Sequence, residues 1–292
     1  MSNIGLIIEE RAANIGNFLV GRLIPFRQKR MVGPFIFIDH MGPATIEANQ
    51  SLDVLPHPHI GLSTLTYLLE GSILHRDSLG NEIEITPGAI NWMTAGKGVV
   101  HSERTPEYLI PQVKKLHGLQ IWVALPKDLE EMEPNFYHIE AKEVPIWEDN
   151  GINYKLVAGK LGAYKSPVPV YSNLYMLELC SNKDAECNIG KDLYGESGLY
   201  ILEGEVEIEG NTFGPKQLLV ANNTSICAFK MKAGARVFIF GGDAFPEERY
   251  IDWNFVSSDK NKIEIAKEKW DKQEFPKVPN ETEFVPYPPK RY

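Results

Sequence analysis

The stretch HPHIGLSTLTYLLEG, residues 57–71, places two histidines one residue apart ahead of a run of aliphatic and β-branched residues. Such a run, closed by a glycine, is typical of a β-strand. Side chains at i and i+2 leave the same face of a strand, so His57 and His59 would share one space, at a separation that a metal ion can span. A polar pair at a strand end, facing solvent or hydrogen-bonded, is the alternative that these two residues alone leave open.

The end of this stretch recurs later in the chain. YLLEG at residues 67–71 returns as YILEG at residues 200–204, and each copy leads to a Gly/Pro turn, at 87–88 and at 214–215. Short apolar runs between turn residues also fill residues 18–125, which predicts many short antiparallel strands in a sandwich or barrel. Two copies of one β-domain would account for 292 residues.

The two copies differ at the histidines. The positions that match His57 and His59 in the second copy are Gly190 and Asp192, and no histidine follows His138. A histidine metal site would therefore belong to the first copy. We predict a first domain over residues 1–135 that carries the metal site, and a second over residues 136–292 that lacks metal ligands.

One helix is expected near the C-terminus. Ile263, Ala266 and Trp270 fall at i, i+3 and i+7, which predicts an amphipathic helix within residues 260–275. The Pro-rich and acidic segment 276–292 is expected to be an extended or frayed tail, and both belong to the predicted second domain.

Composition narrows the class of protein. A hydrophobic fraction of 43% and a charged fraction of 24% are ordinary for a soluble globular chain. No run reaches the ~18 apolar residues of a membrane span, and the N-terminus resembles neither a secretory nor a transit peptide. We expect a cytoplasmic protein, or a nuclear one in a eukaryote. A net charge of −9 argues against direct nucleic-acid binding.

Two further compositional features bear on assembly and redox chemistry. Cys180, Cys187 and Cys227 are odd in number and lack CxxC spacing, so we expect buried thiols rather than disulfides or a zinc site. No long hydrophobic seam is evident, so we expect a monomer.

A second motif, WMTAGKGVVHSE at residues 92–103, contains another pair at i and i+2, His101 and Glu103. Together with His57 and His59 this pair would offer three imidazoles and one carboxylate to a single ion. Such donors suit Fe(II), Mn, Ni, Cu or Zn, and four ligands leave two positions open on an octahedral ion. His75 and Asp77 form a rival pair at i and i+2, which we place at the far end of a hairpin beside the turn at residues 78–81.

Three strings together resemble the pirin family of the cupin superfamily: HPHIGLSTLTYLLEG (57–71), ILHRDSLGN (73–81) and INWMTAGKGVVHSE (90–103). The resemblance is strong over residues 18–125 and weaker in YILEGEVEIEG (200–210) and GPKQLLV (214–220). It implies a bicupin, with two jelly-roll β-barrels in tandem and the metal in the N-terminal one. It also implies iron, as Fe(II), with His57, His59, His101 and Glu103 as its ligands.

The chain departs from the family pattern HPHRGFET at Ile60, Leu62 and Ser63. Counted from His57 and His59, Ser63 has the same strand parity, so we expect it to face the metal cavity and to make that cavity roomier and less negative. His40 is expected to be a structural residue at a strand end or an outer partner of the metal ligands, and His117 and His138 to be ordinary surface or core histidines. Gly96 and Gly98 are expected to be turn residues, and Trp92 and Met93 to line the cavity or the core.

The resemblance implies a quercetin 2,3-dioxygenase, which opens flavonols with loss of carbon monoxide. Its partners would be a small phenolic substrate and dioxygen, with Glu103 accepting the substrate proton. The alternative is an iron-binding, redox-sensitive regulator that docks on transcription factors or metabolic enzymes, and a third hypothesis is the same chemistry on another phenol or enol. If the three imidazoles have an ordinary pKa of ~6.5, acid should displace the metal below that pH.

Overall fold

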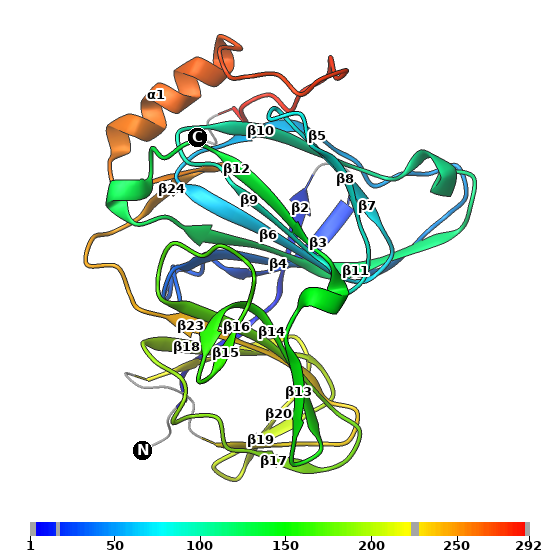
Figure 1. The fold of residues 1–292 in the computed structure, drawn as a ribbon, viewed down its shortest axis with the longest axis vertical. Coiled ribbons are helices and arrows are strands. Elements are labelled where there is room, and N and C mark those ends of the chain that lie inside the picture. The colour runs from blue at the N-terminus through cyan, green and yellow to red at the C-terminus, as the bar shows by residue number, and fades with distance from the viewer. Residues whose placement is uncertain (1–3, 16–17, 223–227, 290–292) are drawn as a thin grey trace. The chain divides into compact units, whose positions relative to one another are not determined.

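The computed structural model describes residues 4–15, 18–222 and 228–289. Within these ranges the regular structure is almost entirely β, with one α-helix, α1 (Lys260–Asp271) (Figure 1). Three single-turn 3-10 helices connect strands, η1 (Glu107–Leu109), η2 (Lys127–Leu129) and η3 (Ala141–Glu143). The predicted all-β class with a short C-terminal helix is therefore confirmed.

Two sheets form what we call the first barrel. The larger sheet has the order β12 (Asn135–Ile139), β9 (Ile90–Thr94), β6 (Leu62–Glu70), β11 (Lys114–Ala124), β4 (Phe35–Ile46), β3 (Phe18–Ile24) and β2 (Arg11–Ile15). The smaller has the order β5 (Val54–His59), β10 (Val99–Arg104), β7 (Ile73–Asp77) and β8 (Glu82–Ile85). The pairings β10–β5, β10–β7, β7–β8, β11–β6 and β6–β9 are antiparallel, as expected from short strands joined by tight turns.

Two further sheets form the second barrel. The larger has the order β1 (Ile4–Glu9), β21 (Gln217–Ala221), β18 (Glu196–Glu203), β23 (Arg236–Gly242), β16 (Leu174–Ser181), β14 (Ile152–Leu161) and β13 (Ile146–Asp149), with β15 (Tyr164–Lys165) beside β14. The smaller has the order β17 (Ala185–Cys187), β22 (Phe229–Met231), β19 (Val206–Ile208) and β20 (Asn211–Phe213). A separate hairpin joins β24 (Tyr250–Asp252) to β25 (Phe255–Ser257).

The repeat seen in the sequence corresponds to equivalent strands. Residues 67–71 end β6 and residues 200–204 end β18, and each segment closes on a glycine with positive φ, Gly71 at 87° and Gly204 at 74°. Glycine is favoured there because a Cβ would strain a backbone with that φ. The duplication thus extends from the sequence to the way each strand ends.

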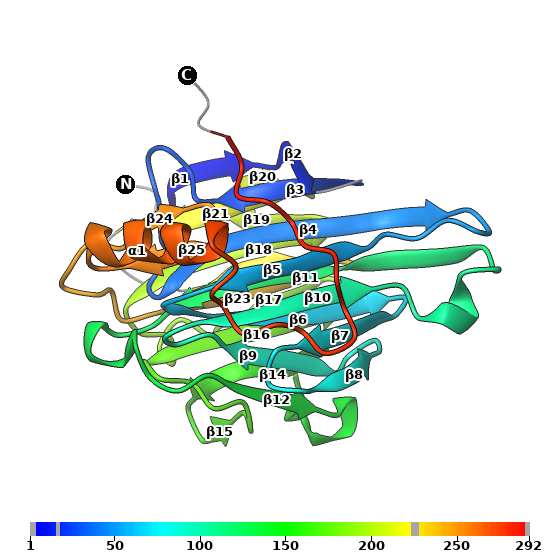
Figure 2. The same cartoon turned by 90° about the horizontal axis from the view of Figure 1, so that it is seen from above.

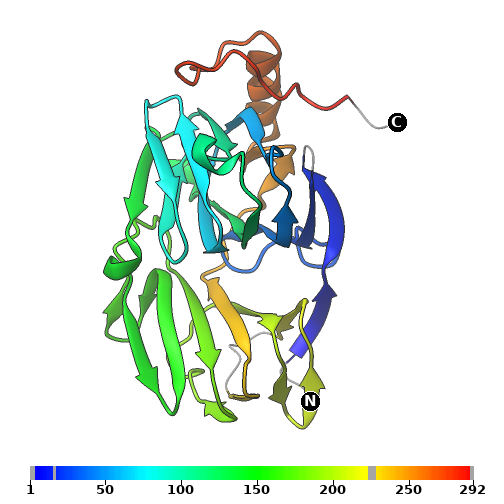
Figure 3. The ribbon, with the colours of Figure 1, turned by 90° about the vertical axis from the view of Figure 1, so that its right-hand side faces the viewer.

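The chain forms two compact units whose segments alternate along the sequence. Unit 1 contains residues 4–12, 21–39, 139–222 and 228–245, and unit 2 contains residues 13–15, 18–20, 40–138 and 246–289. Figure 3 shows β1 in dark blue beside the strands of the second barrel, where it pairs with β21. The domains predicted over residues 1–135 and 136–292 remain a prediction. The units divide the chain differently, since residues 4–12 and 21–39 belong to unit 1 and residues 246–289 to unit 2.

Helix α1 begins where the sequence analysis places it. Asp259 is its N-cap, and the side chain of Asp259 accepts a hydrogen bond from the backbone N–H of Asn261 at 2.9 Å. Ile263, Ala266 and Trp270 form its buried face, as the spacing predicts, and pack against Phe255 of β25 and neighbouring apolar residues. The helix ends at Asp271, earlier than residue 275.

The C-terminal tail lies across the strands of the smaller sheet of the first barrel (Figure 2). The N–H of Val285 donates to the carbonyl oxygen of Pro56 in β5 at 2.9 Å. The carboxylate of Glu281 accepts from Ser102 Oγ and from Arg104, both on β10. The tail therefore contacts the two strands that carry His57, His59 and His101.

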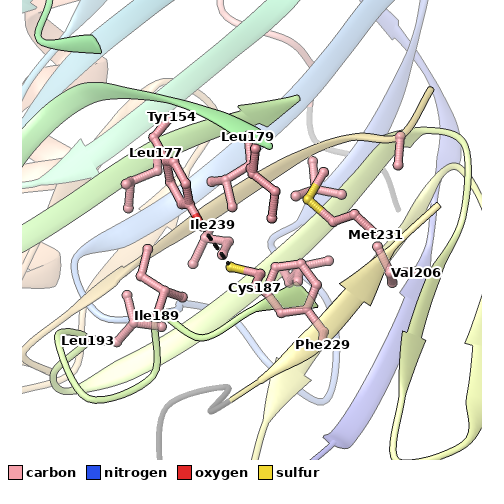
Figure 4. Packing of buried hydrophobic residues seen from close by; sticks show 14 of the residues in the cluster. Tyr154, Leu177, Leu179, Cys187, Ile189, Leu193, Val206, Phe229, Met231 and Ile239 are labelled. Atoms are coloured by element: carbon pink, nitrogen blue, oxygen red, sulfur yellow. Dashed lines mark hydrogen bonds between the residues drawn. The ribbon is translucent and has the colours of Figure 1, made fainter. Parts of the chain in front are cut away.

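Apolar side chains from both sheets fill the second barrel (Figure 4). The hydroxyl of Tyr154 lies 3.5 Å from Cys187 Sγ within this core. Cys187 is buried and Cys180 is partly buried, and both are free thiols, while Cys227 lies outside the described residues. None of the helices in the described part of the chain has the length and apolarity of a membrane span.

Candidate metal centre

Three histidines converge inside the first barrel. The antiparallel pairing of β5 and β10 sets His101 directly opposite His57, and their ring centroids lie 4.3 Å apart. His59 follows at i+2 and therefore shares the face of His57. One ring nitrogen from each lies within 4.8 Å of the others, and all three side chains are buried. The structure thus brings together three of the four predicted ligands, whose role as ligands stays a prediction.

The spacing of these nitrogens fits a divalent metal ion. His59 Nε2 lies 3.1 Å from His101 Nε2. Two imidazoles at right angles on an ion with bonds of about 2.1 Å would place their nitrogens about 3.0 Å apart. His57 Nδ1 donates to the carbonyl oxygen of Leu55 at 2.8 Å, which leaves the lone pair of His57 Nε2 available to a metal.

The protonation states also suit metal binding. Burial lowers the pKa of His57 to about 4, and burial lowers the pKa of His59 and of His101 well below the ordinary value, with the charge of His57 adding to the effect. All three imidazoles are therefore neutral near pH 7, and a neutral imidazole is the form that ligates a metal.

Glu103 lies beside this group but outside it. The pairing of β10 with β5 is irregular between His101 and Glu103, and among the described residues the group of donors within 4.8 Å contains only the three histidines. The carboxylate of Glu103 lies 3.4 Å from Thr66 Oγ1, which is 3.0 Å from Gln120 Oε1. Burial raises the pKa of Glu103 to about 7, against the hydrogen bond from Thr66, which lowers it. This carboxyl therefore exchanges its proton near neutrality.

His75 and Asp77 lie close to the histidine cluster, whereas the sequence analysis placed them at the far end of a hairpin, away from it. The pairing of β7 with β10 sets Asp77 opposite His101 and His75 opposite Glu103. His75 Nδ1 lies 3.4 Å from His101 Nδ1, on the side of the ring away from His59, and His75 Nε2 lies 3.1 Å from Asp77 Oδ2. The rival pair is absent from the group of clustered donors among the described residues, and it contacts His101 from behind.

The prediction that Ser63 faces the metal cavity is wrong. Ser63 and Thr66 are three residues apart on β6 and leave opposite faces, and it is Thr66 that lies beside Glu103. The hydroxyl of Ser63 instead donates to Thr94 Oγ1 at 3.1 Å. The reason is Gly61, whose φ of 69° turns the chain between β5 and β6 and interrupts the alternation counted from His59.

The other histidines lie outside the group. His40 Nε2 and His117 Nε2 face each other at 2.9 Å in a buried pair, and His138 Nδ1 lies 2.7 Å from Asn91 Oδ1.

The two residues predicted to line the cavity or the core, Trp92 and Met93, lie on opposite faces of the larger sheet. Trp92 donates to Thr94 Oγ1, on the same side as Ser63, so of the predicted pair Trp92 and Met93 only Met93 shares the face of Thr66. Gly96 and Gly98 occupy the turn before β10, with φ of 50° and 146°.

Sequence reasoning missed three residues of the site. Thr66, Gln120 and Trp122 share one face of the larger sheet, because β6 and β11 pair Thr66 with Gln120 and Thr64 with Trp122. The edge of the Trp122 ring faces His59, with centroids 5.1 Å apart. The pairing of strands that are distant in sequence decides these contacts, and no local motif signals it.

The described residues of the second barrel contain no equivalent of the histidine cluster. Gly190 and Asp192, which match His57 and His59, lie between β17 and β18 rather than on a strand. Apolar residues of both sheets occupy the interior, and the described residues contain no second group of clustered metal donors.

Known proteins resemble the chain over nearly its whole length. Family models described as pirin and as the pirin C-terminal cupin domain match residues 17–123 and 176–276. A pirin-like protein of Caulobacter vibrioides is 44% identical over 290 residues, which is 98% of this chain and 99% of that protein.

Two solved structures show the same architecture. The crystal structure of a quercetin 2,3-dioxygenase from Acinetobacter baumannii matches with a TM-score of 0.88 and 32% identity, over 98% of this chain and 96% of that one. A bacterial pirin from Escherichia coli, solved in complex with nickel(II), matches with a TM-score of 0.64 and 21% identity, over 82% and 99% of the two chains, which shows a shared fold.

Proposed function

Because the chain belongs to the pirin family of cupin proteins, we propose that it is a metal-dependent dioxygenase of the quercetinase type, which opens flavonols such as quercetin. The observation that carries the proposal is the cluster of three neutral, buried imidazoles beside a carboxyl that titrates near pH 7. The likeness to the quercetin 2,3-dioxygenase of A. baumannii supports it, since that match covers 98% of this chain at 32% identity.

The metal would be held by His57, His59 and His101, with Glu103 as the fourth ligand. When bound, the ion would act as a Lewis acid that lowers the pKa of the substrate hydroxyl and orients the reactants. We propose Fe(II), from the resemblance to pirins, while imidazole and carboxylate donors suit Mn, Ni, Cu and Zn as well.

Glu103 is proposed to accept the proton of the flavonol 3-hydroxyl. A general base works best when its pKa lies near the working pH, and burial raises the pKa of Glu103 to about 7 in the metal-free protein. Thr66 Oγ1, between Glu103 and Gln120, would hold the carboxylate oxygen in place while the proton arrives.

Oxygen uptake tests the proposal. Protein loaded anaerobically with Fe(II) is given quercetin, and uptake is compared with His101→Ala and with His138→Gln, which replaces a histidine outside the cluster. We expect uptake in the wild type and in His138→Gln, and neither uptake nor bound metal in His101→Ala. One equivalent of bound metal without uptake would refute the quercetinase proposal and favour the regulator or a different phenol or enol.

A further inference from the structure

We propose that Asp77 and His75 are positioning residues that hold His101 in its Nδ1–H tautomer, so that the lone pair of His101 Nε2, rather than an N–H, faces His59. The consequence for metal binding rests on the proposed function above, whereas the tautomer itself is a property of the metal-free protein. His101 is the link between the two strands of the site, because it stands opposite His57 on β5 and Asp77 on β7.

The three side chains form a series in which Asp77 contacts His75 and His75 contacts His101. The direction of each hydrogen bond follows from the Asp77 carboxylate, which has no proton to donate. A carboxylate only accepts, so His75 Nε2 donates to Asp77 Oδ2 across 3.1 Å. In the neutral form of its ring, which carries one N–H, His75 Nδ1 must accept. The nitrogen that faces it at 3.4 Å is His101 Nδ1, which therefore donates. The second nitrogen of His101 is left as an acceptor, 3.1 Å from His59 Nε2.

The groups behind His101 are fixed in place. Asp77 is fully buried, and Asp77 Oδ1 accepts from the backbone N–H groups of Leu79 and Asn81 at 2.9 and 3.0 Å. The side-chain amide of Asn81 donates to both oxygens of Asp77. The ring of Phe136 stacks on His75, with centroids 4.5 Å apart and planes 17° apart. These contacts hold the side chains of Asp77 and His75 in place, so neither can rotate and exchange a donor for an acceptor.

The arrangement makes Asp77→Asn an informative variant. Asp77 Oδ1 meets three N–H donors, so the oxygen of the substituted amide would remain at that position and its NH₂ group would face His75. His75 Nε2 would then have to accept, which moves the proton to His75 Nδ1. His101 Nδ1 would have to accept in turn, and the proton on His101 would move to Nε2, the nitrogen proposed to bind metal.

His75→Phe is the matched second variant. A phenyl ring can keep the stack on Phe136 but neither donates to His101 nor accepts from it. In this variant no neighbour at Nδ1 imposes a tautomer on His101, whereas Asp77→Asn would impose the Nε2–H form. We expect Asp77→Asn to weaken metal binding by about 10–100-fold, the range for loss of an outer partner of a metal-binding histidine. His75→Phe should weaken it less, and the double variant should bind as His75→Phe does, that is, more tightly than Asp77→Asn alone.

The experiment has two readouts. The ¹⁵N shifts of His101 in metal-free protein near pH 8, where free imidazoles are neutral, report the tautomer, with His101→Ala supplying the assignment. Titration with Fe(II) or Zn(II) reports the affinity of each variant. Asn81→Ala, which removes turn contacts to Asp77 without touching His75, is the control and should keep the Nδ1–H tautomer.

The outcomes separate the positioning role from the proposed function. An Nδ1–H tautomer in the wild type, an Nε2–H tautomer in Asp77→Asn and recovery in the double variant would establish the positioning role. An Nε2–H tautomer in the wild type, or losses that simply add in the double variant, would overturn it. If the tautomers behave as expected but the wild type binds no metal, the proposed function fails while the positioning role stands.

Discussion

At the scale of single residues, burial acts in opposite directions on the two kinds of titratable group in the site. It lowers the pKa of the three imidazoles and raises the pKa of Glu103, because removal from water penalises the charged form of each. Both effects suit the proposed use of the site, since a neutral imidazole is the form that ligates a metal and the carboxyl exchanges a proton near pH 7.

Acid should release the metal at a lower pH than ordinary histidines would allow. Protons compete for the ligating nitrogens only when the pH approaches their pKa, and the pKa of His57 in the metal-free protein is about 4. We expect metal content, measured after dialysis at stepped pH, to persist below the ordinary imidazole pKa of ~6.5 and to fall nearer to pH 4–5, a window set by His57. Release between about pH 6 and 6.5 would contradict this.

The stability of the metal-free protein should also depend on pH. His57 has a folded pKa of about 4, below its unfolded value, so its contribution is present above pH ~6.5 and is lost as the pH falls toward 4. Glu103 has a folded pKa of about 7, above its unfolded value, so its contribution is lost as the pH rises toward 7. The two slopes oppose each other.

Glu103→Gln removes the opposing titration. We therefore expect the unfolding free energy of this variant, from urea denaturation between about pH 4.5 and 6.5, to rise more steeply with pH than that of the wild type. Equal slopes in the two proteins would show that Glu103 is not protonated in the folded state over this range.

At the scale of elements, the corner between β5 and β6 decides which side chains enter the site. Gly61 has a φ of 69°, and a Cβ added there would meet the carbonyl oxygen of Val256 at 2.0 Å. The preceding residue is tied to β25, where the N–H of Val256 donates to the carbonyl oxygen of Ile60. The turn therefore fixes the orientation of His59 relative to Thr66.

Gly61→Ala should be far more disruptive than a glycine replacement at an open turn. We expect it to lower the unfolding free energy by roughly 3–5 kcal/mol, from backbone strain plus the clash. Gly80→Ala is the control, because Gly80 has a φ of 91° but open space around a Cβ, and strain alone costs about 1–2 kcal/mol. Denaturation midpoints measure both, and equal losses would refute the role of the close contact.

The C-terminal tail is expected to stabilise the strands that carry the site. The side chain of Glu281 is 3% exposed and bonds to Ser102 and Arg104, so Glu281→Ala should cost about 2 kcal/mol. The matched control is Glu283→Ala, since Glu283 is 66% exposed and lies 3.5 Å from Arg104, which predicts a change within about 0.5 kcal/mol. Similar thermal shifts for the two variants would contradict the stabilising role of Glu281.

At the scale of the whole molecule, the duplicated barrels have different interiors. The first contains the histidine cluster and Glu103, and the second is filled by apolar side chains contributed by both of its sheets. Among the described residues this apolar interior has no cluster of metal donors like that of the first barrel, so we expect the chemistry of the protein to reside in one barrel and the other to serve folding stability.

Substitution of Ile239 tests whether the two barrels have these separate roles. It is fully buried in the core of the second barrel, so Ile239→Ala should cost about 2–5 kcal/mol of stability. We nevertheless expect one metal ion per chain in this variant, as in the wild type, because no residue of the histidine cluster is touched. A second bound equivalent in the wild type, or loss of metal in Ile239→Ala, would contradict the division.

Local patterns were enough to predict the all-β class, the duplication and the three clustered histidines, because strand alternation, turn residues and the repeated YLLEG motif can be read without coordinates. The folded chain was needed to show that Ser63 points away from the cavity, that His75 and Asp77 lie behind His101, and that Thr66 lies between Glu103 and Gln120. The physical reason is that residue alternation holds only within a strand: one glycine at positive φ resets it, and the pairing of strands distant in sequence decides which side chains meet.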